Sequence, residues 1–151
     1  MGDKIGVLRS GRLVQVGTPS EIYERPHNTF VARSVGTPPM NLIEGRLDGE
    51  IARLGSFVLP VSSPANSEQK VTFGVRPENI VIQSGAPAEA RVFDIEDQGV
   101  IKILALDMGD TRLHATVPAG THVSRDEVIR FGWKPERVLS FDPETGRNLA
   151  L

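Results

Sequence analysis

The sequence contains one internal repeat, and this repeat constrains the fold more than any other feature. A shift of 58 positions lays segment 71–80 on 129–138 without a gap, and Leu59-Pro60 on Val117-Pro118. The identical pairs are Pro60/Pro118, Phe73/Phe131, Gly74/Gly132, Pro77/Pro135 and Glu78/Glu136. Each copy leads a strand-like run through a glycine into a Pro-Glu turn, after which a new strand begins. We therefore expect two related β-units around one core, the alternative being chance convergence of two Pro-Glu turns.

From Met40 onward, short strand-like runs alternate with turns, which is typical of a small barrel or sandwich. The segments 62–68 and 84–87 are rich in Ser, Pro and Gly and are expected to be surface loops. The predicted strands are 42–47, 49–54, 56–61, 71–75, 79–83, 88–96, 100–107, 111–117, 127–133 and 137–141. The chain is therefore expected to be mainly β.

The first 36 residues have a different pattern, which predicts a hairpin and two short helices. Apolar runs at 4–8 and 13–16 flank a glycine-bearing turn. The segment Thr18-Pro19-Ser20-Glu21 is a capping box, and its helix should end near Arg25 because proline follows. A second helix can begin at His27 or Asn28 and stop at Gly36. The segment 37–39, Thr-Pro-Pro, then marks a boundary.

Composition argues against several classes of partner. The formal net charge is −2 and no block of Lys or Arg occurs, so the electrostatic footprint of a nucleic-acid binder is missing from the sequence. There are no cysteines, which excludes disulfides and thiolate chemistry. No apolar run approaches the roughly 20 residues that a membrane helix needs. We therefore expect a soluble, unexported protein that does not bind nucleic acid.

Motifs for catalysis are also missing from the sequence. It contains no phosphate-binding G-x-x-x-x-G-K-[ST] or G-x-G-x-x-G run and no G-x-S-x-G nucleophile elbow. His27, His114 and His122 are scattered without metal-ligand spacing, and His114 has the pattern of an exposed strand position. The acidic stretches 94–97 and 107–110 are interpreted as solvated strand ends, although paired carboxylates can bind a cation weakly. The chain is not expected to be an enzyme or to bind a cofactor or metal.

The two large aromatic residues allow a structural and a functional interpretation. Tyr23 and Trp133 could stack on a ligand or anchor a partner, because amphipathic rings dominate interface energies. We favour a core position for each of them.

The first 41 residues resemble one protein family closely. One run carries this resemblance: Met1-Gly2-Asp3-Lys4-Ile5-Gly6-Val7-Leu8, then Gly11-Arg12-Leu13-Val14-Gln15-Val16-Gly17-Thr18-Pro19, then Glu21-Ile22-Tyr23. It is similar to the end of the nucleotide-binding domain of MalK-like sugar-importer ATPases. The segment 28–41 is similar to that group's passage into its regulatory domain, and Gly74-Val75-Arg76-Pro77-Glu78 matches a motif of that domain. The resemblance identifies the family and leaves the transported substrate open.

The resemblance implies a division of the chain and a non-catalytic role. Residues 1–35 would be a remnant of the nucleotide-binding domain, and 36–151 an OB-like, TOBE-type regulatory β-barrel. The P-loop, signature motif, Walker B acid and switch histidine would belong to a longer parent protein, so that this chain is a fragment. Ile5, Val7, Leu13, Val14, Ile22 and Phe30 would then lack their usual partners or pack elsewhere.

The resemblance also implies partners. Two copies would pair through this region as a homodimer, and the parent would use ATP and Mg²⁺ and contact membrane permease subunits from the cytoplasmic face of the inner membrane. An inhibitory protein or small effector could bind as well. The candidate regulatory or interface residues are Met40 and Asn41 at the inter-domain junction and Arg76 and Glu78 in the motif loop.

Two alternatives remain open at this point. Arg76 and Glu78 could instead form a structural salt bridge or turn cap. The whole chain could instead be a stand-alone β-barrel that binds a small sugar or oxyanion. An OB-type nucleic-acid binder is disfavoured by the charge.

Overall fold

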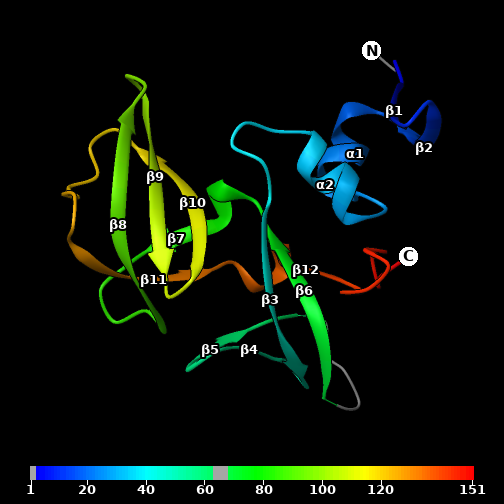
Figure 1. Cartoon of the computed structure of the whole chain (residues 1–151). Helices are drawn as coiled ribbons and strands as arrows, with labels where there is room; N and C mark the ends of the chain where they lie inside the picture. Colours follow the sequence, from blue (N-terminus) through cyan, green and yellow to red (C-terminus); the bar gives the residue numbers. More distant parts are fainter. Residues whose placement is uncertain (1–2, 63–67) are drawn as a thin grey trace.

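The N-terminal part folds as the sequence predicts, in a computed structural model that describes residues 3–62 and 68–151 (Figure 1). A hairpin of β1 (Ile5–Arg9) and β2 (Arg12–Gly17) leads into α1 (Pro19–Glu24) and α2 (Thr29–Ser34). Both bonds of the capping box between Thr18 and Glu21 are present, and α1 ends at its C-cap Arg25. Asn28 rather than His27 caps α2, and Gly36 has a φ of +92°, which favours glycine. The predicted hairpin, helices and caps are confirmed.

Two five-stranded antiparallel sheets make up the rest of the chain. One has the order β12-β6-β3-β4-β5 and the other β10-β9-β8-β11-β7. All ten predicted strands are present, with ends within two residues of those expected. Their bounds are β3 (Asn41–Asp48), β4 (Ile51–Leu54), β5 (Phe57–Pro60), β6 (Gln69–Val75), β7 (Ile80–Ile82), β8 (Ala88–Asp97), β9 (Ile101–Met108), β10 (Thr111–Pro118), β11 (Val128–Trp133) and β12 (Leu139–Phe141).

The internal repeat is confirmed as two copies of one sheet topology that exchange their last strands. Strands β3 to β6 form one unit and β8 to β11 the other, and a 3-10 turn follows each unit, η1 (Pro77–Asn79) or η2 (Pro135–Arg137). After its turn, β7 pairs with β11 of the other unit, and β12 pairs with β6. The registers are equivalent, because Gly132 faces Val81 across one pair and Gly74 faces Leu139 across the other. Each sheet is therefore completed by the partner unit.

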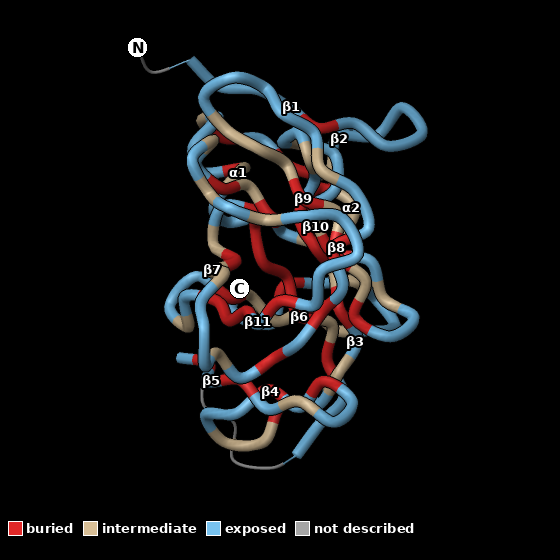
Figure 2. Tube along the Cα trace, turned by 90° about the vertical axis from the view of Figure 1, so that its left-hand side faces the viewer, coloured by how far each residue is buried: buried red, intermediate tan, exposed pale blue. Residues whose placement is uncertain are grey.

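A single hydrophobic core spans both units, as shown by the buried positions in the middle of the trace (Figure 2). Phe73 and Phe131, equivalent in the repeat, are both fully buried there. Trp133 packs 6.0 Å from Phe73 between ring centroids, and its indole N–H donates a hydrogen bond of 2.7 Å to the Pro60 carbonyl. The predicted core position of Trp133 is confirmed.

The helix pair packs against the C-terminal tail, which follows β12 back toward it (Figure 1). The buried Asn148 carries this contact: its side chain donates to the Pro26 carbonyl and its backbone N–H to the His27 carbonyl. Val7, Ile22 and Val31 form a small core within the helical part. Of the apolar residues expected to lack partners, Val7 and Ile22 are thus buried within the chain and Val14 and Phe30 partly so, whereas Ile5 and Leu13 are exposed.

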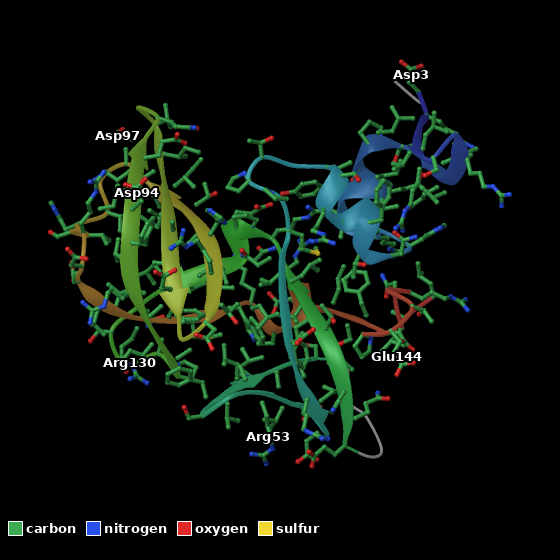
Figure 3. The ribbon with its side chains drawn as sticks, viewed as in Figure 1. Asp3, Arg53, Asp94, Asp97, Arg130 and Glu144 are labelled. Carbon is green, nitrogen blue, oxygen red and sulfur yellow. The ribbon has the colours of Figure 1, made fainter. Side chains whose placement is uncertain are left out.

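Three expectations about surface residues have different outcomes. His114 is half-buried and not exposed, and it lines a shallow hollow together with Thr37 and Pro38. The acidic stretch on β8 is exposed, with Asp94 and Asp97 on the sheet distant from the helix pair (Figure 3). Most of the predicted loop at 62–68 lies outside the described residues.

Candidate functional site

Arg76 joins the two helices to the β-sheets. It follows β6 directly, and only 4% of the residue is exposed. One terminal nitrogen, Nη1, donates to the carbonyls of Ala32 and Val35 at 3.0 and 2.9 Å, and Nη2 donates to the carbonyl of Tyr23 at 2.8 Å. These carbonyls lie toward the C-terminal ends of α1 and α2, where helical carbonyls lack partners within the helix and a cation is favourable. Arg76 therefore caps both helices from the β-domain.

Tyr23 lies between Arg76 and Glu78. The Arg76 guanidinium carbon stands 4.0 Å from the centroid of the Tyr23 ring, a cation–π contact. The Tyr23 hydroxyl donates a hydrogen bond of 2.6 Å to a carboxylate oxygen of Glu78. The motif Arg76-Pro77-Glu78 thus holds a hydroxylated ring with a cation on its face and a carboxylate at its hydroxyl.

The environment of these groups shifts their protonation. Burial, followed by the hydrogen bond to the Glu78 carboxylate and by its charge, raises the pKa of Tyr23 to about 12. Burial lowers the pKa of Arg76, opposed by the electrostatic interactions with Tyr23 and then with Glu78. Tyr23 is therefore neutral and Arg76 charged at physiological pH.

The structure distinguishes between the interpretations of the motif loop. Within the described residues there is no ion pair between Arg76 and Glu78, and the side chain of Arg76 does not cap η1. The salt-bridge and turn-cap interpretations are therefore wrong, because the side chains hold Tyr23 and the helix carbonyls instead. Tyr23 itself is half-buried, between the predicted core position and an exposed one.

Met40 and Asn41 lie where the chain passes from the helices into β3. Met40 is buried in a cluster with Ala32 of α2 and Phe141 of β12. The Asn41 side chain accepts a hydrogen bond of 2.8 Å from the His114 backbone N–H and donates one of 2.9 Å to the His114 carbonyl. It thereby acts as one residue of a β-ladder that joins β3 to the edge of β10.

Gly74 permits the close packing around Met40. A β-carbon at position 74 would lie 2.6 Å from the Met40 sulfur and 2.7 Å from the Phe141 ring. At the equivalent Gly132, the nearest atom would be 3.4 Å away, on Pro87. The close approach of Met40 and Phe141 to the backbone therefore requires glycine at position 74, whereas the packing around position 132 does not require it.

A cleft of about 740 Å³ opens beside these residues. It brings together Met40, Arg76 and Glu78 of the predicted candidates, whereas Asn41 does not line it. Its walls come from α1, from both 3-10 turns and from the tail near Asn148. Such a volume suits a small-molecule ligand.

The sequence did not predict that Arg76 and Asn148 would hold the helix pair. Both donate hydrogen bonds to backbone carbonyls. Every residue has such a carbonyl, so the sequence does not show which ones are the partners. The repeat did contain a usable signal, because Arg76 and Glu78 align with Lys134 and Glu136, and these line the same cleft.

Metal binding and membrane insertion have no support in the part of the chain that the structure describes. No group of three or more His, Cys, Asp or Glu side chains there is placed to hold a metal ion. Likewise, none of the helices in residues 3–62 and 68–151 is long and apolar enough to cross a bilayer.

The fold and the junction define a class, a β-domain of two OB-like units that carries a docked helix pair. Comparison with protein families agrees, because residues 36–80 match the MalK OB fold domain and residues 73–141 match the TOBE domain. By these two matches, which together span residues 36–141, the chain belongs to the MalK-like OB/TOBE domain family.

Relatives match along nearly the whole chain. The sn-glycerol-3-phosphate import ATP-binding protein UgpC of Ruegeria sp. (strain TM1040) is 34% identical over 99% of this chain and 43% of its own length. The xylose/arabinose import ATP-binding protein XacK of Haloferax volcanii is 34% identical over 97% of this chain and 41% of its own. The sulfoquinovosyl glycerol transport ATP-binding protein SmoE of Agrobacterium fabrum is 32% identical over 99% of this chain and 44% of its own length. The chain thus spans less than half the length of these relatives.

Proposed function

We propose that this chain forms the non-catalytic regulatory and dimerisation region of the ATP-binding subunit of an ABC importer, one that carries a carbohydrate or a related polyol. The observation that carries the proposal is the match along nearly the whole chain to import ATP-binding proteins for pentoses, glycerol phosphate and a glycosyl glycerol. In the proposed parent protein, ATP hydrolysis drives import, and ATP and Mg²⁺ bind outside this chain.

The proposal assigns a part to each end of the chain. Residues 1–35 correspond to the end of the nucleotide-binding domain and 36–151 to the regulatory domain, a division supported by the start of the OB match at residue 36. The parent would contact permease subunits at the cytoplasmic face of the inner membrane. A second copy of the chain would be the partner of the regulatory domain.

The contacts of Arg76 support a mechanical role for the junction. Three hydrogen bonds from one buried guanidinium fix the C-terminal ends of two helices to the first β-unit. A rigid connection of this kind would make the β-domain follow any rotation of the helix pair. The domain could then keep two copies paired while the nucleotide-binding domains open and close.

Sedimentation of the purified chain tests this proposal. We expect a mass twice that of the 16.4 kDa chain at high concentration, reversing to monomer on dilution, and no turnover of ATP with Mg²⁺. A strictly monomeric chain would contradict the dimerisation role and favour a stand-alone ligand-binding barrel. Measurable ATP hydrolysis would contradict the non-catalytic assignment.

A further inference from the structure

The two repeat-related turns face the same cleft, but only one of them holds a side chain. Arg76 and Glu78 hold Tyr23, as described above. Their counterparts Lys134 and Glu136 also line the cleft. In the described residues, neither has a salt bridge or a side-chain hydrogen bond.

The two turns are in direct contact, so their charged groups share one site. The backbone N–H of Lys134 donates a hydrogen bond of 3.2 Å to the carbonyl of Asn79, the last residue of η1. The side chains of Lys134 and Glu136 are exposed, whereas Arg76 is buried. The second turn therefore presents a cation and a carboxylate at the same sequence spacing as the pair that holds Tyr23 in the first turn.

The charges around the cleft indicate the kind of ligand that fits. Its charged side chains are the cations Arg25, Arg76, Lys134 and Arg137 and the carboxylates Glu24, Glu78 and Glu136. The Arg137–Glu24 pair spans 4.0 Å with both side chains more than half exposed, so it is weak and can exchange partners. Cations suit an acidic group, and carboxylates accept hydrogen bonds from hydroxyls.

We infer that this cleft binds a small polyhydroxylated anion with one acidic group, that group at Lys134 and the hydroxyls at Glu136 and Asn79. Lys134 is the exposed cation of the second turn, so it is the partner for one acidic group on the ligand. The pairing of carboxylate and cation repeats what the first turn does with Tyr23. The site depends on the fold alone and not on the proposed role in an importer.

Proton NMR of the full chain with gluconate as the probe tests this inference. Tyr23 is the only tyrosine and lines the cleft, and Trp133 is the only tryptophan and does not line it. Gluconate should shift the Tyr23 ring resonances saturably while the Trp133 indole N–H stays in place. Sorbitol, with hydroxyls and no acid, and acetate, with an acid and no hydroxyls, should each bind at least tenfold more weakly. Glucitol 6-phosphate has a phosphate in place of the carboxylate, so a comparison of its affinity with that of gluconate shows which acid the cleft prefers.

Variants of the second turn decide whether it is the binding group. Lys134→Ala should weaken gluconate binding about tenfold and Glu136→Gln should weaken it less, because the amide still accepts a hydrogen bond. Lys70→Ala, at an exposed position of β6 outside the cleft, is the matched control and should bind as the unmodified chain does. No Tyr23 shift with either acidic polyol at millimolar concentration overturns the inference. So does equal loss in the Lys134 and Lys70 variants. Dimerisation and ATP turnover are measured separately, so failure here leaves the proposed function standing.

Discussion

At the scale of single residues, Arg76 carries the contact that should be hardest to replace. Replacement by alanine leaves the carbonyls of Tyr23, Ala32 and Val35 without this donor, so we expect the free energy of unfolding to fall by about 3 kcal/mol. Arg76→Lys should still cost about 2 kcal/mol, since an ammonium cannot reproduce the planar fork. Urea denaturation measures both.

The repeat supplies the control for Arg76. Lys134 occupies the equivalent position but is exposed, so Lys134→Ala should change the free energy of unfolding by less than about 0.5 kcal/mol. Equal losses at 76 and 134 would show that the helix contacts of Arg76 contribute little.

Gly74 allows a second comparison within the repeat. In Gly74→Ala the new methyl would overlap the Met40 sulfur, which can move, and the fully buried Phe141 ring, which cannot easily do so. We expect a loss of about 1–3 kcal/mol from this overpacking. Gly132→Ala meets only ordinary contacts and should be close to neutral. Thermal unfolding of the two variants decides the point, and similar melting temperatures would contradict it.

The residues divide into those that the sequence could predict and those that it could not. Met40 and Asn41 lie at the expected junction because a Pro-Pro break after Gly36 fixes where β3 can begin. The role of Arg76 could not be predicted, because its partners are backbone carbonyls more than 40 positions away in the sequence. Asn148 is unpredictable for the same reason, since its partner Pro26 is separated from it by 122 positions.

At the scale of secondary-structure elements, the attachment of α1 to the β-domain should depend on pH through Tyr23. Its pKa of about 12 in the folded chain lies above the ordinary value of 10.0, so the folded state favours the protonated hydroxyl. This stabilisation is complete below pH 10 and is lost as the pH rises from 10 through 12. Because Tyr23 is only half-buried, solvent screening reduces the effect to about 1 kcal/mol.

A comparison with Tyr23→Phe isolates this effect. The variant has no phenol to ionise, so its free energy of unfolding should fall less steeply between pH 10 and 12, while lysines titrate alike in both proteins. Urea midpoints at a series of pH values give the two slopes. Parallel curves would contradict the assignment of the alkaline loss to Tyr23.

Element boundaries followed from local chemistry, but the pairing of elements did not. The alternation of apolar residues and the glycine turns fix ten short strands, and the capping box fixes α1. The repeat indicated two related units without revealing that β7 and β12 change places. That exchange depends on the path of the backbone through η1 and η2. Because the two copies of the repeat have equivalent sequences, they are compatible with β7 and β12 pairing either within their own unit or with the other unit.

At the scale of the whole molecule, the exchange of strands makes each unit incomplete without the other. A unit without its partner would have β6 or β11 as an unpaired edge and would open the shared core. We therefore expect one cooperative unfolding transition for the β-domain, despite its two-unit architecture. Phe141→Ala tests this expectation. Phe141 is fully buried on β12, which pairs with β6, so its truncation perturbs the first sheet directly and should lower the free energy of unfolding by about 3–5 kcal/mol.

Two probes in one urea titration can distinguish one transition from two. Trp133 fluorescence reports on the contact between the two units, because this residue of β11 packs against Phe73 of β6, and far-UV circular dichroism reports on all strands. In Phe141→Ala, both midpoints should move down by the same amount, although residue 141 pairs with the first sheet. Val100→Ala, in the exposed turn between β8 and β9, should move neither midpoint by more than the equivalent of about 0.5 kcal/mol. If about half of the strand signal remained after Trp133 had lost its native emission, one unit would stay folded without the other and the exchanged strands would not couple them.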